Sequence, residues 1–264
     1  MDIVVCVKQV PDVTDAELEI TKDGKDIERE DLEMDINEWD NYAVEEAVRL
    51  KEAHGGTVTV VTLGDEDTED VLRHSLAMGA DAAIRVDLEG FEGSDGSGVA
   101  WGLYGAIREL SFDLLLTGVQ SSDDGWGQVG LLLAERLSIP YASLVVGIDE
   151  VKGDSLVVRR ELESNTQEKI EIPLPALLTV QTGINIPRYV SIMGIQKVRK
   201  IRIEEKEAED LELDDSRIGE EGACVASITL SLPPVGEGAE MLTGSLDQIC
   251  EKTAQIIRDK GGVE

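Results

Sequence analysis

Apolar segments of strand length alternate with segments of helical periodicity along more than the first half of this chain, and this alternation constrains the fold most strongly. The predicted strands cover residues 3–7, 57–63, 83–86 and 113–117, and a predicted helix lies between each strand and the next. A chain that passes from strand to helix to strand returns in the same direction, which gives parallel strands with helices on both faces. The strands are apolar almost throughout, as buried strands are. We therefore expect an α/β fold with an open, mostly parallel, Rossmann-like sheet.

Capping residues indicate where the helices begin. Asp40 and Asn41 are good N-caps, so we expect the first helix to follow them and to end at Gly55. Ser97 is expected to cap another helix, whose inward residues are Val99, Leu103, Ile107 and Leu110. Each helix would bury one apolar stripe against the sheet.

The pattern changes after Pro140. Residues 144–148, 155–162, 169–172 and 176–181 are predicted to be strands with little helix between them. Such strands favour an antiparallel edge on the parallel sheet. We assign residues 1–200 to one nucleotide-binding type of α/β domain.

Residues 201–264 are predicted to be an acidic linker and a C-terminal arm. Residues 203–222 are mostly Glu and Asp with few side chains able to enter a core, which is typical of a solvated linker. A last helix is predicted at about 244–259, with an apolar face formed by Leu246, Ile249, Cys250, Thr253, Ile256 and Ile257. This helix would pack either on its own domain or on a partner.

The charge of the chain excludes several classes of function. Lys and Arg number 24 against 55 Asp and Glu, a formal net charge of −31. Such a chain is repelled by nucleic-acid phosphates and by anionic membranes. It contains no apolar run of about 18 residues that would span a membrane. The N-terminus lacks the basic region and long apolar region of a signal peptide.

Cysteine and histidine usage makes a metal centre improbable. The three cysteines, Cys6, Cys224 and Cys250, are far apart, and the chain has two histidines. Neither a zinc ligand set nor an iron–sulfur ligand set is present. An odd number of unpaired thiols favours a reducing compartment, so we expect a cytoplasmic location. No G-x-S-x-G elbow and no P-loop is present, so the sequence leaves open whether the chain is an enzyme.

The best local candidate for a site is the loop of residues 118–130, which follows the strand 113–117. In open α/β sheets, ligands bind at such strand ends. Glycines allow the backbone to approach a phosphate, and the start of the following helix supplies N–H donors. Asp123 and Asp124 would repel a phosphate, so we expect them on ribose hydroxyls or as helix caps. The alternative is an ordinary turn between strand and helix.

A second candidate is a cluster of cations in an otherwise acidic chain. Five cations lie between residues 188 and 202, namely Arg188, Lys197, Arg199, Lys200 and Arg202. The cluster is either a solvated strand edge or a contact surface for an acidic partner or a phosphate.

Four stretches, taken together, resemble the β subunit of electron transfer flavoproteins. They are Val5-Cys6-Val7-Lys8-Gln9-Val10-Pro11-Asp12, Asn37 through Ala43-Val44-Glu45-Glu46-Ala47, Leu76-Ala77-Met78-Gly79-Ala80-Asp81, and Leu174-Pro175-Ala176-Leu177-Leu178-Thr179-Val180 continuing through Asn185-Ile186-Pro187-Arg188-Tyr189. With Gln128-Val129-Gly130, the matches run in family order across about residues 1–200.

The resemblance implies a heterodimer with an α subunit that carries a redox-active FAD. The β subunit would hold an adenine nucleotide, either AMP or, in electron-bifurcating members, a second FAD. Trp126 stands where a small hydroxyl residue is usual, and it would either stack on adenine or block a longer ligand. The implied cofactor contacts are Cys6, Asn37, Glu38, Trp39, Asp40, Leu63, Val119, Gln120, Ser121, Ser122, Asp123, Asp124, Gly125, Trp126, Gly127, Gln128, Val129 and Gly130.

The resemblance also implies surfaces for partners. Arg160 and Glu161 match a pair that faces the flavin of the α subunit, and Ile192, Met193 and Gly194 match a loop that docks acyl-CoA dehydrogenases. The C-terminal arm and last helix would embrace the α subunit. The implied function is an electron carrier subunit that works between flavin dehydrogenases and an acceptor and does no covalent chemistry itself. The alternative is a stand-alone adenine-nucleotide-binding regulator or hydrolase on a similar fold.

Overall fold

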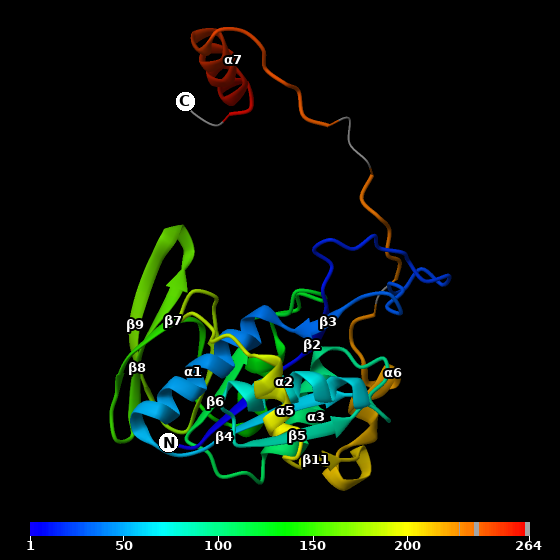
Figure 1. Ribbon diagram of the computed structural model, residues 1–264, viewed down its shortest axis with the longest axis vertical. Coiled ribbons are helices and arrows are strands. Elements are labelled where there is room, and N and C mark those ends of the chain that lie inside the picture. Colours follow the sequence, from blue (N-terminus) through cyan, green and yellow to red (C-terminus); the bar gives the residue numbers. More distant parts are fainter. Residues whose placement is uncertain (227, 235–237, 262–264) are drawn as a thin grey trace.

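One large sheet organises the fold, and the computed structural model describes residues 1–226, 228–234 and 238–261 of the chain. The strands are β1 (Ile3–Cys6), β2 (Gln9–Pro11), β3 (Met34–Ile36), β4 (Val58–Gly64), β5 (Ala82–Asp87), β6 (Leu114–Gly118), β7 (Tyr141–Val151), β8 (Ser155–Leu162), β9 (Thr166–Pro173), β10 (Ala176–Val180) and β11 (Ile203–Lys206). The helices are α1 (Glu38–His54), α2 (Glu69–Met78), α3 (Gly96–Ile107), α4 (Val129–Leu137), α5 (Ile192–Val198), α6 (Gly219–Gly222) and α7 (Leu246–Asp259). The large sheet has the order β11-β5-β4-β1-β6-β10-β7-β8-β9, and β2 pairs with β3 (Figure 1).

The strands from β11 to β7 are parallel, and β8 and β9 add an antiparallel edge. Both the parallel sheet and the antiparallel edge confirm the predicted fold class. One detail differs, because β10, which was expected in the antiparallel edge, lies in parallel between β6 and β7. The reason is that β7 is long enough to pair with two neighbours, and it bends at Leu144, where φ is +57°. Tyr141 and Ala142 pair with β10, Val145 pairs with both β10 and β8, and the residues from Gly147 onward pair with β8.

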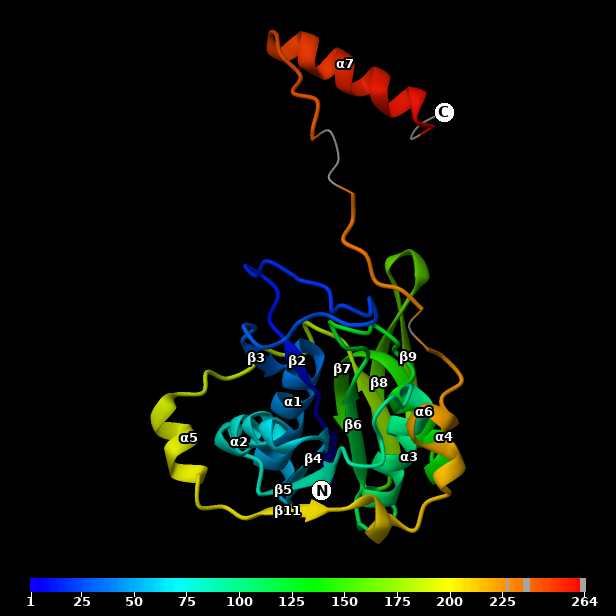
Figure 2. The same cartoon turned by 90° about the vertical axis from the view of Figure 1, so that its right-hand side faces the viewer.

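Helices cover both faces of the sheet because successive strand residues point to opposite sides. Ile3, Val5 and Val7 join the core under α1 and α2, whereas Val4 and Cys6 join the core under α3 and α4. Figure 2 shows the sheet between these two pairs of helices. After β5 the chain crosses to the other face of the sheet through α3. The next strand, β6, is then added on the opposite side of β1 from β4, so the strand order reverses at β1.

The helix caps differ from those expected. The N-cap of α1 is Asn37, and Asp40 lies inside the first turn. The N-cap of α3 is Asp95, whose Oδ1 accepts hydrogen bonds from the backbone N–H groups of Ser97 (2.8 Å) and Gly98 (3.1 Å). Asp95 precedes the glycine-rich start of α3 by one residue and accepts two bonds, so it displaces Ser97 as the cap.

Residues 203–222 pack on the body instead of forming a solvated linker. β11 extends the sheet beside β5, and the buried Arg85 of β5 pairs with Glu205 and, at 2.6 Å, with Asp87. Leu211 and Ile218 enter the core under α3. The acidic composition hid these few inward side chains, because the outward residues of an edge strand can all be charged.

The C-terminal arm then leaves the body and ends in α7 (Figures 1 and 2). Asp95 holds the start of the arm, since its Oδ2 accepts from the backbone N–H groups of Cys224 and Val225. The predicted last helix is confirmed as α7, which Ser245 caps. No residue of α7 is buried in the described part of the chain. The arm predicted at 201–264 includes residues 227, 235–237 and 262–264, which lie outside the described residues. The role of the arm in docking stays a prediction.

Candidate functional site

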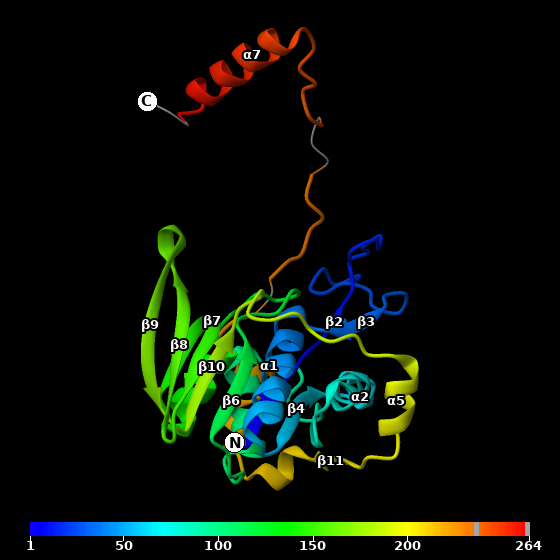
Figure 3. The same ribbon diagram turned by 60° about the vertical axis from the view of Figure 1, so that its left-hand side comes forward.

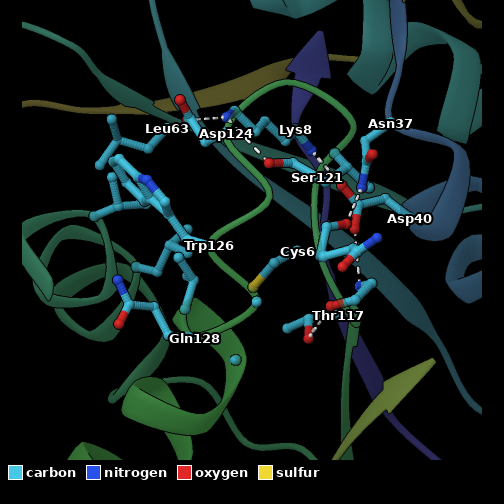
Figure 4. A pocket seen from close by; sticks show the side chains of 18 of the residues that line it. Cys6, Lys8, Asn37, Asp40, Leu63, Thr117, Ser121, Asp124, Trp126 and Gln128 are labelled. Carbon is cyan, nitrogen blue, oxygen red and sulfur yellow. Dashed lines mark hydrogen bonds and ion pairs between the residues drawn. The ribbon is translucent and has the colours of Figure 1, made fainter. Parts of the chain in front are cut away.

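A cavity of about 310 Å³ opens where β1, β4 and β6 reach their carboxyl ends (Figure 4). This is the point at which the strand order of the sheet reverses, and open α/β sheets bind ligands at such points. The volume is at the lower end of the ~300–1,000 Å³ that ligand pockets span. The loop of residues 118–130 forms one wall of the cavity, and the segment that leads into α3 forms another.

Most of the sequence-predicted site residues meet in this cavity. Those that line it are Cys6, Asn37, Asp40, Leu63, Val119, Gln120, Ser121, Asp124, Trp126, Gly127, Gln128, Val129 and Gly130. Five others do not line it, namely Glu38, Trp39, Ser122, Asp123 and Gly125. Trp39 points elsewhere, because its Nε1 donates to Oε1 of Gln181 at 2.8 Å.

Several lining residues were not predicted from the sequence. Lys8 and Thr117 stand at strand ends, and an apolar wall consists of Leu88, Phe91, Val99 and Leu103. Lys8 could have been found, since it is the cation that follows the first strand within two residues. The apolar wall could not, because its residues look like ordinary inward positions of a helix and its preceding loop.

Asp40 braces two strand ends beneath the cavity. Its Oδ2 accepts from the backbone N–H of Lys8 and its Oδ1 from that of Gly118, each at 2.8 Å. The side chain is buried, and burial raises the pKa of Asp40 to about 6 in spite of these two donors. Asp40 therefore fixes the spacing between β1 and β6.

Asn37 fixes the loop to the start of α1. Its Nδ2 donates to the carbonyl of Gln120 at 2.8 Å, and its Oδ1 accepts from the backbone N–H of Ser122 at 3.2 Å. The residue is 1% exposed, so these bonds form away from water. The side chain thus serves the loop instead of capping its own helix.

Lys8 pairs with the two acids of the loop. Its Nζ lies 2.7 Å from Oδ2 of Asp123 and 2.7 Å from Oδ2 of Asp124. Burial of Asp123 opposes its ionisation, but the bond and charge of Lys8 outweigh burial and lower its pKa. Neither acid caps α4, whose N-cap is Gln128; both fasten the loop to Lys8, just after β1. A contact with a ribose stays a prediction.

Replacing Lys8 by Met should loosen the loop. Two partly exposed ion pairs contribute about 1 kcal/mol together, and their loss leaves Asp123 beside Asp124 without a counter-ion. We expect faster amide hydrogen exchange in residues 121–127, and a smaller effect of added salt on that exchange than in the wild type. Lys169→Met is the matched control, because it removes the exposed pair with Asp149 far from the cavity. Equal exchange in both variants would contradict the role of Lys8.

The start of α4 presents free backbone donors to the cavity. No described side chain caps this helix, and its first residues, Val129 and Gly130, line the cavity. The first N–H groups of a helix have no partner within it and carry a partial positive charge. This end of α4 can therefore bind an anion.

Glycine at position 130 keeps α4 close to the sheet. A Cβ there would meet the Oγ1 of Thr117 on β6 and would lie 3.0 Å from Cγ2 of Thr179 on β10. Gly125 and Gly127 have φ values of +63° and +62°, which glycine adopts without strain. Gly125 and Gly127 thus allow the turns of the loop, and Gly130 allows α4 to lie close to β6 and β10.

Cys6 contributes a buried thiol to the floor of the cavity (Figure 4). Burial, together with the nearby Asp40, raises the pKa of this thiol well above its ordinary value. A protonated thiol is a weak nucleophile. Cys6 therefore acts as a small apolar contact, as expected from its place in a strand.

Comparisons with known proteins agree on one family. Residues 25–211 match the family model described as the electron transfer flavoprotein domain. The chain is 36% identical to the electron transfer flavoprotein subunit beta of Methylophilus methylotrophus over 99% of this chain and 100% of that protein. It is 37% identical to the subunit of the same name from Bacillus subtilis over 94% and 95% of the two chains. It is also 34% identical to the caffeyl-CoA reductase-Etf complex subunit CarD of Acetobacterium woodii, over 98% and 99%.

The chain belongs to the electron transfer flavoprotein family. Its near full-length similarity to β subunits identifies it as an electron-transfer subunit of that type. This membership favours the subunit over the alternative of a stand-alone regulator or hydrolase.

The residues of this electron transfer flavoprotein subunit that were expected to face partners lie outside the cavity. Arg160 and Glu161 are on β8, where Nε of Arg160 lies 2.7 Å from Oε2 of Glu168 and Glu161 accepts from Gln181. Ile192, Met193 and Gly194 form the first turn of α5, on the other side of the sheet (Figure 3). The two groups therefore belong to different surfaces.

The described residues of the subunit contain no group of three His, Cys, Asp or Glu side chains that could hold a metal ion. None of their helices is both long enough and apolar enough to cross a membrane.

Proposed function

We propose that this chain is the β subunit of a heterodimeric electron transfer flavoprotein and that its cavity holds AMP. The observation that carries the proposal is the uncapped start of α4, which turns its free N–H groups toward the cavity. A phosphate satisfies such donors and interacts favourably with the helix dipole.

The other end of the cavity suits a planar base. Its wall is formed by Leu63, Leu88, Phe91, Val99 and Leu103, side chains with no polar group. Pockets that combine an apolar wall with a few polar groups are typical of small-molecule sites. Trp126, which is 39% exposed, stands beside this wall and can stack on an aromatic ring.

The size of the cavity favours a mononucleotide over a dinucleotide. A volume of about 310 Å³ is close to the lower limit of ligand pockets. On the volume alone we favour AMP, and a second FAD is the alternative outcome of the test below.

The electron-transfer role belongs to the complex with an α subunit. An FAD of that subunit supplies the redox chemistry, while the residues of this chain position the two subunits and a flavin dehydrogenase such as an acyl-CoA dehydrogenase. Arg160 and Glu161 would lie toward the α subunit, and the arm with α7 would bury its apolar face on it. A location in the cytoplasm, a reducing compartment, is part of the same proposal and is supported by three cysteines that form no disulfide.

The test is to co-express the chain with its α subunit and to denature the purified complex. The released nucleotides are then identified by mass spectrometry and quantified per heterodimer. We expect one FAD and one AMP per heterodimer. Two FAD and no AMP would mean that the cavity of this chain holds a second FAD. One FAD with no other nucleotide would overturn the proposal.

A variant tests the place of the phosphate. Gln128→Glu sets a carboxylate beside the start of α4 without changing the size of the side chain, and like charges repel. We expect less bound nucleotide per heterodimer. Gln167→Glu on β9 makes the same change away from the cavity and should retain the wild-type amount.

A further inference from the structure

The connection between β10 and β11, residues 181–202, crosses the outside of α1 and α2 and carries α5 (Figure 2). It exposes several large apolar side chains to solvent. Their exposed fractions are 89% for Ile186, 91% for Tyr189, 76% for Ile192 and 70% for Met193. Such a patch on an otherwise charged surface marks a contact site.

By itself, α5 would be a weak helix. It has seven residues, and isolated helices shorter than about 12 residues are marginal in water. At its start, Oγ of Ser191 accepts from the backbone N–H of Gly194 at 3.1 Å. The end of the helix needs a partner for its last carbonyl groups.

Arg73 of α2 supplies that partner. Its Nη1 donates to the carbonyl of Val198, at 3.1 Å, and to the carbonyl of Ile201. The side chain is 18% exposed, so these charge-assisted bonds are partly shielded from water. One guanidinium thus ties the last turn of α5 and the residues after it to the body.

Arg188 holds the connection upstream of α5. Its guanidinium pairs with Glu45 and Glu52 of α1, both at 2.8 Å, and its backbone N–H donates to Glu45 as well. These bonds raise the pKa of Arg188 further above its ordinary value. The connection is therefore fastened on both sides of α5.

We propose that Arg73 is a positioning residue for partner docking, which rests on the proposed function. It holds α5 in the shape that presents Ile192 and Met193, so that an incoming flavin dehydrogenase meets a preformed surface. A preformed surface loses less conformational freedom on binding than one that must first be ordered.

The neighbouring charges indicate the chemistry of the surface that α5 fits. Lys197, Arg199, Lys200 and Arg202 are exposed beside the apolar patch, on a chain with a net charge of −31. A partner surface with an apolar pocket bordered by carboxylates would complement this arrangement.

The first test compares Arg73→Met with Arg29→Met in the αβ complex, with a purified acyl-CoA dehydrogenase as electron donor. This variant loses the same charge, and among the described residues Arg29 pairs on the surface with Asp26, three positions before it. For Arg73→Met we expect KM for the dehydrogenase to rise about five- to tenfold with kcat unchanged. Arg73→Lys should restore part of the loss, because one ammonium cannot reproduce the fork of the guanidinium.

The second readout is amide hydrogen exchange. Arg73→Met should lose protection within residues 192–202 and keep it in α2 and in the sheet, with the wild-type nucleotide content. Unchanged exchange or an unchanged KM would overturn this inference while leaving the proposed function intact. If the wild-type complex accepts no electrons, the proposed function itself fails, and this inference fails with it.

Discussion

Replacing Gly118 by alanine is expected to lower the free energy of unfolding by about 2–3 kcal/mol and to reduce the nucleotide content of the complex. A Cβ at this position would meet Oδ1 of Asp40 and would lie 2.7 Å from Cβ of Trp39. Both residues belong to the first turn of α1, so the helix and the end of β6 must move apart. That movement would break the bond from Gly118 to Asp40 and widen the cavity.

Chemical denaturation of the two variants Gly118→Ala and Gly153→Ala measures this effect. Gly153 lies between β7 and β8, and a Cβ there would have no neighbour within 4 Å. Gly153→Ala should therefore leave the free energy of unfolding nearly unchanged, because the added methyl group meets no neighbouring atom. Equal stability of the two variants would mean that α1 does not constrain the end of β6.

Asp40 is expected to make the fold more stable as the pH falls from about 6 to about 4. Burial raises its pKa from 3.8 in the unfolded chain to about 6 in the folded one. Between these values the folded state binds more protons than the unfolded state, so the free energy of unfolding rises as the pH falls. A shift of this size corresponds to about 3 kcal/mol over the whole interval, of which about 2 kcal/mol lies between pH 7 and pH 4.5.

The measurement is the difference in unfolding free energy between the wild type and Asp40→Asn at several pH values. The wild type should gain on the variant as the pH is lowered, because asparagine does not titrate. For Asp2→Asn we expect the opposite trend, in which the wild type loses its stability advantage over the variant as the pH falls. Hydrogen bonds from Thr57 lower the pKa of Asp2, so the stabilisation by its carboxylate is lost in acid. A difference for Asp40→Asn that stays constant with pH would contradict the raised pKa.

The fold could be predicted from the sequence because its strands are buried on both faces. Residues 114–116 are three consecutive leucines, and both helix-covered cores take side chains from them. Patterns on the surface were less informative. Glu204 and Glu205 are both exposed on β11, so an edge strand was mistaken for a linker.

The place of the candidate site was also predictable, but its internal bonds were not. The loop of residues 118–130 follows a strand end and contains glycines, and both features are local. The bond from Asp40 to Gly118 joins residues 78 positions apart, and the ion pairs of Lys8 join residues more than 110 apart. Such pairs depend on how the elements stack, which a single sequence does not reveal.

The position of α5 between two strands of one sheet limits how the docking segment can change. β10 fixes its start beside β6 and β7, and β11 fixes its end beside β5. An insertion or deletion between Arg188 and Ile201 would change the spacing between the two points at which the connection is fastened to α1 and α2, whereas a replacement at Ile192 or Met193 would leave these bonds untouched. New specificity can therefore evolve here by exchanging outward side chains at constant length, and a grafted loop from a relative should be matched residue for residue.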